Sequence, residues 1–188
     1  MLDLADTSTG SGELQYLKWV NAIGKFSIDG NDNILLDLKG ILVDPESLRT
    51  GWGYITKGAS PEWVWDEQLG IRGPEPEAKG PEPGDRFKRG FSLDVFIPDV
   101  GWRNWTTNAK GTGIGINDVW PKVHEQAKEN KGKLAKLAFK GAKDVDPMKI
   151  PVFELTGWVD NPEEPAPPVK AEPAPAPSAD KKSDGEWF

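Results

Sequence analysis

RFKRGFSLDVFIPDVGWRNW, residues 86–105, contains the clearest strand pattern in the chain. One side of the pattern is apolar and holds Phe91, Leu93, Val95 and Ile97. The other side holds Ser92, Asp94 and Phe96. Strict alternation of this kind predicts a β-strand that buries one face in a core.

The same stretch also mixes cations with aromatic rings. The cations are Arg86, Lys88, Arg89 and Arg103, and the rings are Phe87, Phe91, Phe96, Trp102 and Trp105. Cations follow a phosphate backbone, and flat rings stack on unpaired bases. The pattern therefore fits a surface for single-stranded nucleic acid, and it equally fits a half-buried strand with ordinary solvated ends.

The composition excludes several classes of function. The 188 residues include no cysteine and a single histidine, His124. Thiol catalysis, cysteine zinc sites, His-based triads and multi-histidine metal sites are therefore excluded, and we expect no enzyme, metal or cofactor. No apolar run is long enough to span a membrane, and the first ten residues do not resemble a secretory signal. Nine tryptophans exceed what one small core usually needs, which favours binding.

The net charge of -7 is concentrated in segments without hydrophobic periodicity. Residues 161–188 hold six acids and three bases, and residues 1–13 hold three acids and no base. We therefore predict three parts: a disordered arm at 1–13, a folded body at 14–160, and a disordered Pro/Ala-rich acidic tail at 161–188. A Pro/Glu-rich loop at 72–85 is expected to protrude from the body.

The element order along the body is dominated by strands. We expect strands at 15–28 with a bend at 21–24, at 34–44, at 48–58, at 86–97, at 131–143 and at 149–159. Residues 131–143 also fit a helix with Leu134, Leu137, Ala138 and Gly141 on one side, and the strand is preferred because Gly132 and Gly141 bracket a short run. One helix is expected at 117–130. Residues 60–70 resemble a helix start or an irregular loop, and the GTGIG segment at 111–115 is interpreted as a flexible loop rather than a phosphate-binding loop.

This order predicts a mainly β fold. Three strands, a long insertion, a fourth strand, one helix and closing strands are typical of an OB-fold-like five-stranded Greek-key barrel. In the third strand, Trp52 and Tyr54 share one face between glycines, with Arg49 and Lys57 near the ends. These two rings form either a stacking platform or part of the core, with the glycines marking a barrel corner.

The tail ends in acids followed by two aromatic residues. Its residues Asp184, Glu186 and Phe188, with the linker at 162–178, resemble the tails of bacterial and phage single-stranded DNA-binding proteins. That family pairs an OB-fold body with a disordered acidic tail that ends in phenylalanine, although Trp187 stands here where proline is usual. The body segments TGWGYITKG and KRGFSLDVF also resemble uncharacterised phage proteins encoded near replication and recombination functions.

The resemblance implies a non-sequence-specific single-stranded DNA-binding protein of phage replication or recombination, acting in the cytoplasm of a bacterial host. The expected stacking residues are Trp52, Tyr54, Phe91, Phe96, Trp102 and Trp105. The expected phosphate contacts are Arg49, Lys57, Arg86, Lys88, Arg89, Arg103 and Lys110. Replication or recombination proteins would bind the tail at Asp184, Glu186, Trp187 and Phe188, and the body could form a homo-oligomer. The alternative is a β-rich carbohydrate-binding or virion structural module, which would also expose tryptophans.

Overall fold

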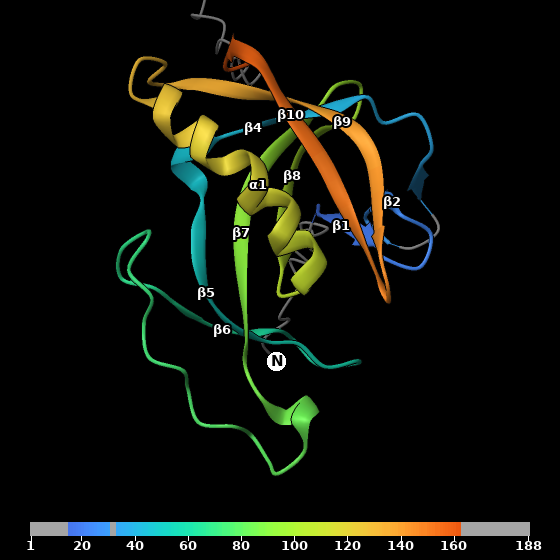
Figure 1. The fold of residues 1–188 in the computed structure, drawn as a ribbon, viewed down its shortest axis with the longest axis vertical. Coiled ribbons are helices and arrows are strands. Elements are labelled where there is room, and N and C mark those ends of the chain that lie inside the picture. The colour runs from blue at the N-terminus through green and yellow to red at the C-terminus, as the bar shows by residue number, and fades with distance from the viewer. Residues whose placement is uncertain (1–14, 31–32, 163–188) are drawn as a thin grey trace, which may run out of the picture.

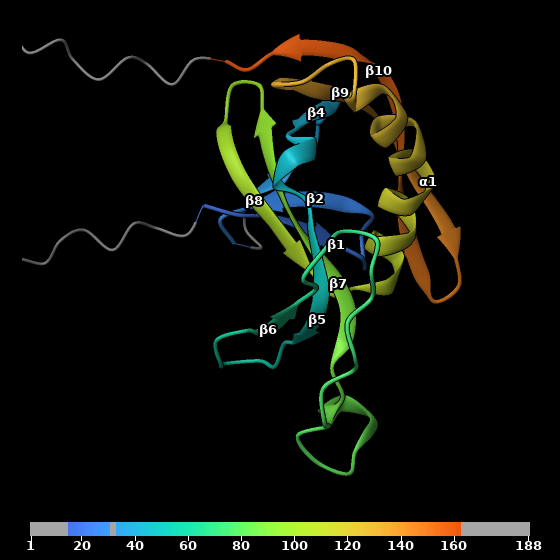
Figure 2. The same ribbon diagram turned by 90° about the vertical axis from the view of Figure 1, so that its left-hand side faces the viewer.

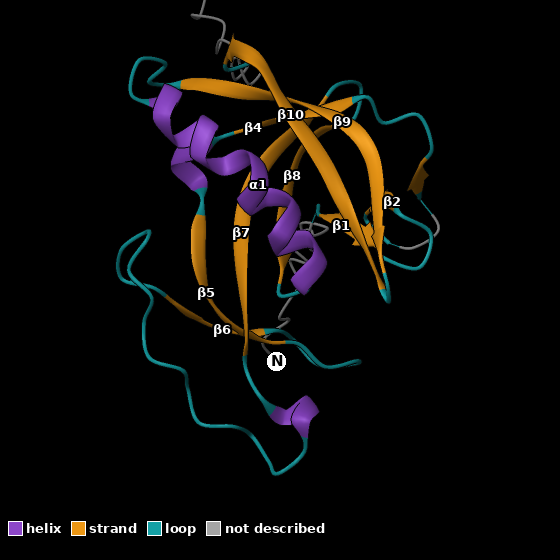
Figure 3. Cartoon of the chain, in the orientation of Figure 1, coloured by secondary structure: helices purple, strands orange, loops and turns teal. Residues whose placement is uncertain are grey.

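A computed structural model describes residues 15–30 and 33–162. With 48% of the described residues in strands, this part of the protein is mainly β, as the sequence predicted. The strands are β1 (Leu17–Val20), β2 (Lys25–Ile28), β3 (Ile34–Leu35), β4 (Gly40–Val43), β5 (Arg49–Tyr54), β6 (Glu62–Trp65), β7 (Lys88–Ile97), β8 (Gly101–Thr107), β9 (Lys133–Val145) and β10 (Met148–Asp160). The described part has one α-helix, α1 (Lys110–Ala127), and two short 3-10 turns, Pro45–Ser47 and Pro83–Asp85 (Figure 3).

The strands form two antiparallel sheets (Figure 1). The larger has seven strands in the order β10-β9-β4-β7-β5-β6, with β8 paired to β7, and the smaller is β1-β2-β3. Neither sheet closes on itself within the described residues, so the closed five-stranded barrel is not confirmed. Helix α1 lies across one side of the larger sheet, against β10 and opposite β8 (Figure 2).

Strand β7 is the centre of the larger sheet. It pairs with β5 over its first half, with β4 near its end, and with β8 over residues 91–97. The alternation read from the sequence is confirmed, because Phe91, Leu93, Val95 and Ile97 are buried while the residues between them are half-buried or exposed.

The core beneath β7 is built around aromatic rings. Trp105 is fully buried and meets Phe26, Phe91 and Phe153 edge-on at centroid distances of 5.3, 5.3 and 6.0 Å. Edge-to-face packing of this kind adds to the free energy gained from burying the rings. Helix α1 completes the core with Ile116, Val119 and Val123.

The N-terminal hairpin β1-β2 occupies the space between β8 and β10. Tyr16 forms a parallel bridge with Asn104 of β8. On the other side, the Trp19 indole Nε1 donates to the Lys149 carbonyl at 2.8 Å, and the Lys149 backbone N donates to Asn21 Oδ1 at 2.7 Å. The predicted bend at 21–24 is therefore the turn of a hairpin, and the core is covered on this side without a continuous ladder.

Two sequence expectations are wrong. Residues 62–65 form strand β6 rather than a helix start or an irregular loop, because they pair with the extended β5. The helix begins at Lys110 instead of 117, so GTGIG lies in its first turns and is not a flexible loop. Two of its glycines allow close packing, since a Cβ at Gly115 would overlap the Pro151 carbonyl of β10 and one at Gly111 would lie 3.3 Å from the Lys149 carbonyl.

The remaining strand expectations hold, with adjusted boundaries. The predicted strands at 131–143 and 149–159 are the hairpin β9-β10. The strand predicted at 34–44 is interrupted and forms β3 and β4.

We expect Trp105→Ala to lower the free energy of unfolding by about 3–5 kcal/mol, because it leaves a large cavity among the core rings. Denaturant unfolding followed by circular dichroism would measure the loss. Trp105→Phe, which keeps a ring, should lose less than the alanine variant. A change below about 1 kcal/mol for the alanine variant would contradict this account of the core.

Candidate nucleic-acid interface

The outer face of β5, β6 and β7 carries two stacked tryptophans. The rings of Trp63 and Trp65 lie parallel, with centroids 4.5 Å apart and an interplanar angle of 1°. Both residues are half-buried, and they lie on the opposite side of the sheet from the aromatic core. We call this pair the tryptophan platform.

Glycines beneath the rings leave room for the tryptophan platform. Gly53 pairs with Trp63 and Gly51 pairs with Trp65 across the β5-β6 ladder. A Cβ at Gly53 would lie 2.6 Å from the Trp63 ring, and one at Gly51 would lie 2.9 Å from the Trp65 ring. Gly90 of β7 extends this floor, since a Cβ there would also meet the Trp63 ring, at 2.7 Å. The rings therefore rest directly on the backbone of the sheet.

Two cations border the tryptophan platform. The Arg49 guanidinium lies over the Trp65 ring, 4.6 Å from its centroid. Lys88 pairs with Gly53 and is exposed on the same face. Neither side chain forms an ion pair with another residue in the described ranges, so both charges are available to an anionic ligand.

A second aromatic pair lies on the same face near the other end of β7. Phe96 and Trp102 pair across β7 and β8, with ring centroids 5.6 Å apart. On the other side of Phe96, Leu42 of β4 is its partner, and Lys136 of β9 pairs with Leu42 in turn. Between the two aromatic pairs is a hydrogen-bonded polar cluster. Its members are Ser92, Asp94, Asn104 and Thr106.

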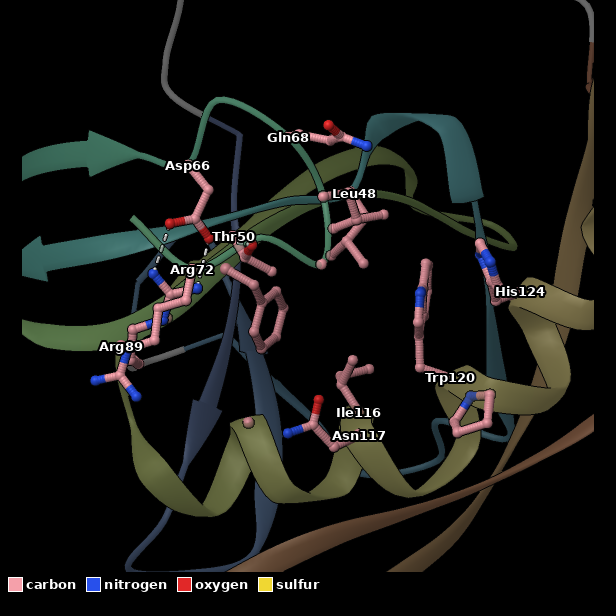
Figure 4. A pocket seen from close by; sticks show the side chains of 16 residues that line it. Leu48, Thr50, Asp66, Gln68, Arg72, Arg89, Ile116, Asn117, Trp120 and His124 are labelled. Carbon is pink, nitrogen blue, oxygen red and sulfur yellow. Dashed lines mark hydrogen bonds and ion pairs between the residues drawn. The ribbon is translucent and has the colours of Figure 1, made fainter. Parts of the chain in front are cut away.

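The inner face of the sheet is the side that bears Phe91 and the core. Behind the tryptophan platform, this face holds a charged pair instead of exposed rings. Asp66 accepts two hydrogen bonds from the Arg89 guanidinium, at 2.8 and 2.5 Å, and one from the Thr50 hydroxyl (Figure 4). Chiefly because of Arg89, and with help from Thr50 and the Gly73 backbone N–H, the pKa of the Asp66 carboxyl is far below its usual value near 3.8. This pair fixes the segment that follows the tryptophan platform against β7.

Three of the predicted stacking residues cannot stack on a base in this structure. Trp105, Phe91 and Trp52 are only 0–4% exposed. The first two face the aromatic core, and the Trp52 indole is covered by Arg72 and Arg89 and donates to the Gly73 carbonyl. Burial on the inner face is the physical reason for the correction, because the alternation of a strand sends these rings inward.

The other predicted residues are divided among several places. The outer face brings together Arg49, Lys88, Phe96 and Trp102. Tyr54 packs against Phe87, while Arg89 pairs with Asp66 and Arg103 with Asp29. Three more cations are exposed on other segments, namely Lys57, Arg86 and Lys110. The predicted tail residues Asp184, Glu186, Trp187 and Phe188 lie outside the described residues.

Sequence reasoning missed Trp63 and Trp65 as site residues. The signal that could have found them is a matching alternation in two segments, one of tryptophans and one of glycines. Trp63 and Trp65 flank Val64 in one strand, and Gly51 and Gly53 flank Trp52 in its partner. Two rings two residues apart, opposite two glycines two residues apart, indicate an aromatic pair lying on a sheet.

Neither a metal centre nor a membrane span is found in the part of the chain described. Residues 15–30 and 33–162 hold no group of His, Asp and Glu side chains arranged for a metal ion. Over the same residues, no helix has the length and apolarity needed to cross a membrane. Comparisons with family models, curated proteins and solved structures found no match to this chain.

We expect Asp66→Asn to destabilise the protein at neutral pH by about 1–3 kcal/mol, because Arg89 loses its carboxylate partner but can still reach water. A carboxyl with a lowered folded pKa stabilises the protein above the unfolded pKa, and that contribution is lost as pH falls below it. The difference from the wild type should therefore shrink below about pH 4. Denaturant titrations at several pH values would measure it.

A matched control is Glu154→Gln. Glu154 also has a lowered pKa, caused by Lys140, but the pair is exposed and should contribute little at any pH. A difference between wild type and Asp66→Asn that stays constant down to low pH would contradict the role of the Asp66 charge.

Proposed function

We propose that this protein binds single-stranded DNA without sequence specificity, through the outer face of β5, β6, β7 and β8. The observation that carries the proposal is the tryptophan platform, which presents two parallel rings beside two cations that have no acidic partner in the described residues. Bases of every sequence have a flat face that can stack on such rings, and cations beside the rings meet the phosphates.

The topology supports the finer proposal of an OB-type fold. The order β4/β5, β7, β8, α1, β9, β10 matches the strand and helix order of that fold, with β4/β5 acting as one interrupted first strand. In OB-fold terms, β4/β5 is the first strand, β7 the second, β8 the third, β9 the fourth and β10 the fifth. Strand β7 pairs with β4/β5 and with β8, and β9 pairs with β4 and with β10. In a closed barrel the third and fifth strands would also pair, and here the hairpin β1-β2 lies between β8 and β10 instead.

In this interpretation the tryptophan platform lies where OB-folds bind oligonucleotides. That site is the face of the second and third strands together with the first connecting loop, here β7, β8 and the segment that contains β6. The platform rests on Gly90 and the second aromatic pair begins at Phe96, so the face extends about 20 Å along β7. Asp94 would repel phosphates, so we place the backbone of the strand along Arg49 and Lys88.

The tail completes the proposal. Residues Asp184, Glu186, Trp187 and Phe188 would recruit replication or recombination proteins, as the resemblance to phage and bacterial single-stranded DNA-binding proteins implies. An aromatic anchor beside acids fits a basic-rimmed apolar pocket on such a partner.

We expect Trp63→Ala to weaken binding of a labelled oligo(dT) by about 5- to 150-fold, because one stacked base is lost. Trp65→Ala should weaken binding as well, because the Trp65 ring supports Trp63 on one face and holds Arg49 on the other. Fluorescence anisotropy would measure the affinity. The matched control is Val64→Ala, which changes the residue between them on the opposite face of β6 and should bind like the wild type. Unchanged affinity in both tryptophan variants, or equally tight binding of duplex DNA by the wild type, would reject the proposal.

We expect Arg49→Ala to lower the salt dependence of oligo(dT) binding. Each phosphate neutralised on a single strand contributes about 0.7 to the slope of log affinity against log salt concentration. The variant slope should therefore be smaller by about 0.7, measured by repeating the anisotropy titration at several salt concentrations. An unchanged slope would mean that Arg49 contacts no phosphate.

A carbohydrate-binding module is the second candidate. The polar cluster between the two aromatic pairs favours it, because a carboxylate, an amide and hydroxyls beside tryptophan rings can also hydrogen-bond a sugar. Salt separates the two candidates, since binding of a neutral sugar would hardly depend on it.

A further inference from the structure

A groove of about 760 Å³ lies on the inner side of the sheet, between α1 and strands β5 and β7 (Figure 4). Its volume is in the range of specific ligand sites. The floor is apolar and comes from three elements: Leu48 precedes β5, Phe91 belongs to β7, and Ile116 and Trp120 belong to α1. Trp120 is only half-buried, so its ring is reachable from the groove.

One stripe of α1 faces this groove. Gly113, Asn117, Trp120 and His124 are spaced three or four residues apart, which places them on one side of the helix. No atom lies within 4 Å of a Cβ built at Gly113, so the groove is open at this end of the stripe. Asn117 points from the helix toward the sheet in Figure 4.

The rim of the groove has one uncompensated charge. Asp66 neutralises Arg89, while Arg72 forms no ion pair with any residue in the described ranges. The Arg72 guanidinium lies 4.5 Å from the centroid of the buried Trp52 ring, which holds it at the rim. The exposed amides of Gln68 and Asn117 also line the groove, and neither hydrogen-bonds to another described residue.

We propose that this groove binds a short segment of a partner protein that presents a large apolar side chain next to an acidic one. The apolar side chain would fill the space over Phe91 and Trp120, and the acid would pair with Arg72. The amides of Gln68 and Asn117 can each donate to and accept from the backbone of an extended segment. Aromatic and Arg side chains are also the types that contribute most to binding at protein interfaces.

The lining argues against a nucleic acid in the groove. A strand needs several cations along its backbone, and the groove offers one charge that is not neutralised. The groove and the tryptophan platform also lie on opposite faces of β5 and β6, because Trp52 and Trp63 alternate across the sheet. A partner in the groove would therefore leave the platform free, and this inference does not depend on the proposed DNA binding.

The test is a selection of random linear peptides displayed on phage, using the full-length chain as the target. Enriched peptides are expected to combine a large apolar residue with a neighbouring acid. Asn117→Trp fills the groove from an exposed helix position, and Arg72→Glu reverses its charge from a loop. Each should weaken the selected peptides by about tenfold or more, measured by anisotropy with the synthetic peptide.

Matched controls make the same kinds of change at positions outside the groove. Asp118→Trp adds the same side chain one residue along α1, and Lys128→Glu reverses an exposed charge at the end of α1. Both should bind the peptide like the wild type, and all four variants should keep the oligo(dT) affinity of the wild type. If Asp118→Trp or Lys128→Glu lost oligo(dT) binding but kept peptide binding, the location proposed for the DNA site would be wrong and the groove proposal would stand.

Several results would overturn the proposal. Peptides that bind Asn117→Trp as well as the wild type would place the contact elsewhere, and enrichment of basic peptides would reject the charge argument. Competition between oligo(dT) and the peptide would make the groove part of the nucleic-acid site. If sedimentation shows that the wild type self-associates and Asn117→Trp does not, the occupant is a second copy.

Discussion

The alternation of side chains along β7 is the constraint on which the rest of the structure depends. Its inner residues pack against Trp105 and α1, and its outer residues face the tryptophan platform and the polar cluster. Because the period of a strand is two, a slip of one residue would exchange these faces completely. The core therefore fixes the register, and the register in turn fixes which side chains can meet a ligand on the outer face.

Asp66 and Arg89 connect the two surfaces of the sheet. Asp66 directly follows Trp65, and its side chain is 1% exposed and bound to Arg89 and Thr50. The carboxylate also accepts from the Gly73 backbone N–H, which ties down the first part of the long connection to β7. One ion pair thus holds β6 in place beneath the tryptophan platform and forms part of the groove wall on the other side.

The sequence predicted the local pattern better than the pairing. The faces of β7 and the strand at 149–159 followed from alternation, which is a local property. The strand at 131–143 followed from the glycines that bracket it, and its pairing with β10 was not predicted. The start of α1 was placed too late because glycines are weak helix formers, whereas here they allow α1 to approach β10. Proximity to cations in the sequence indicates candidate stacking rings, but it does not show whether a ring is exposed. Whether Trp52 or Trp63 is buried depends on which strand pairs with which, and that information is not local.

The docking of the hairpin β1-β2 has a consequence for the order in which the protein folds. The hydrogen bond from Trp19 to Lys149 joins residues 130 positions apart, whereas β7-β8 and β9-β10 join neighbouring segments. Contacts between distant segments carry a larger loop-closure entropy and slow folding. During synthesis β1-β2 emerges from the ribosome before every other described strand, yet its partner carbonyl on β10 is made near the end. The first hairpin to be translated is therefore among the last to reach its final place.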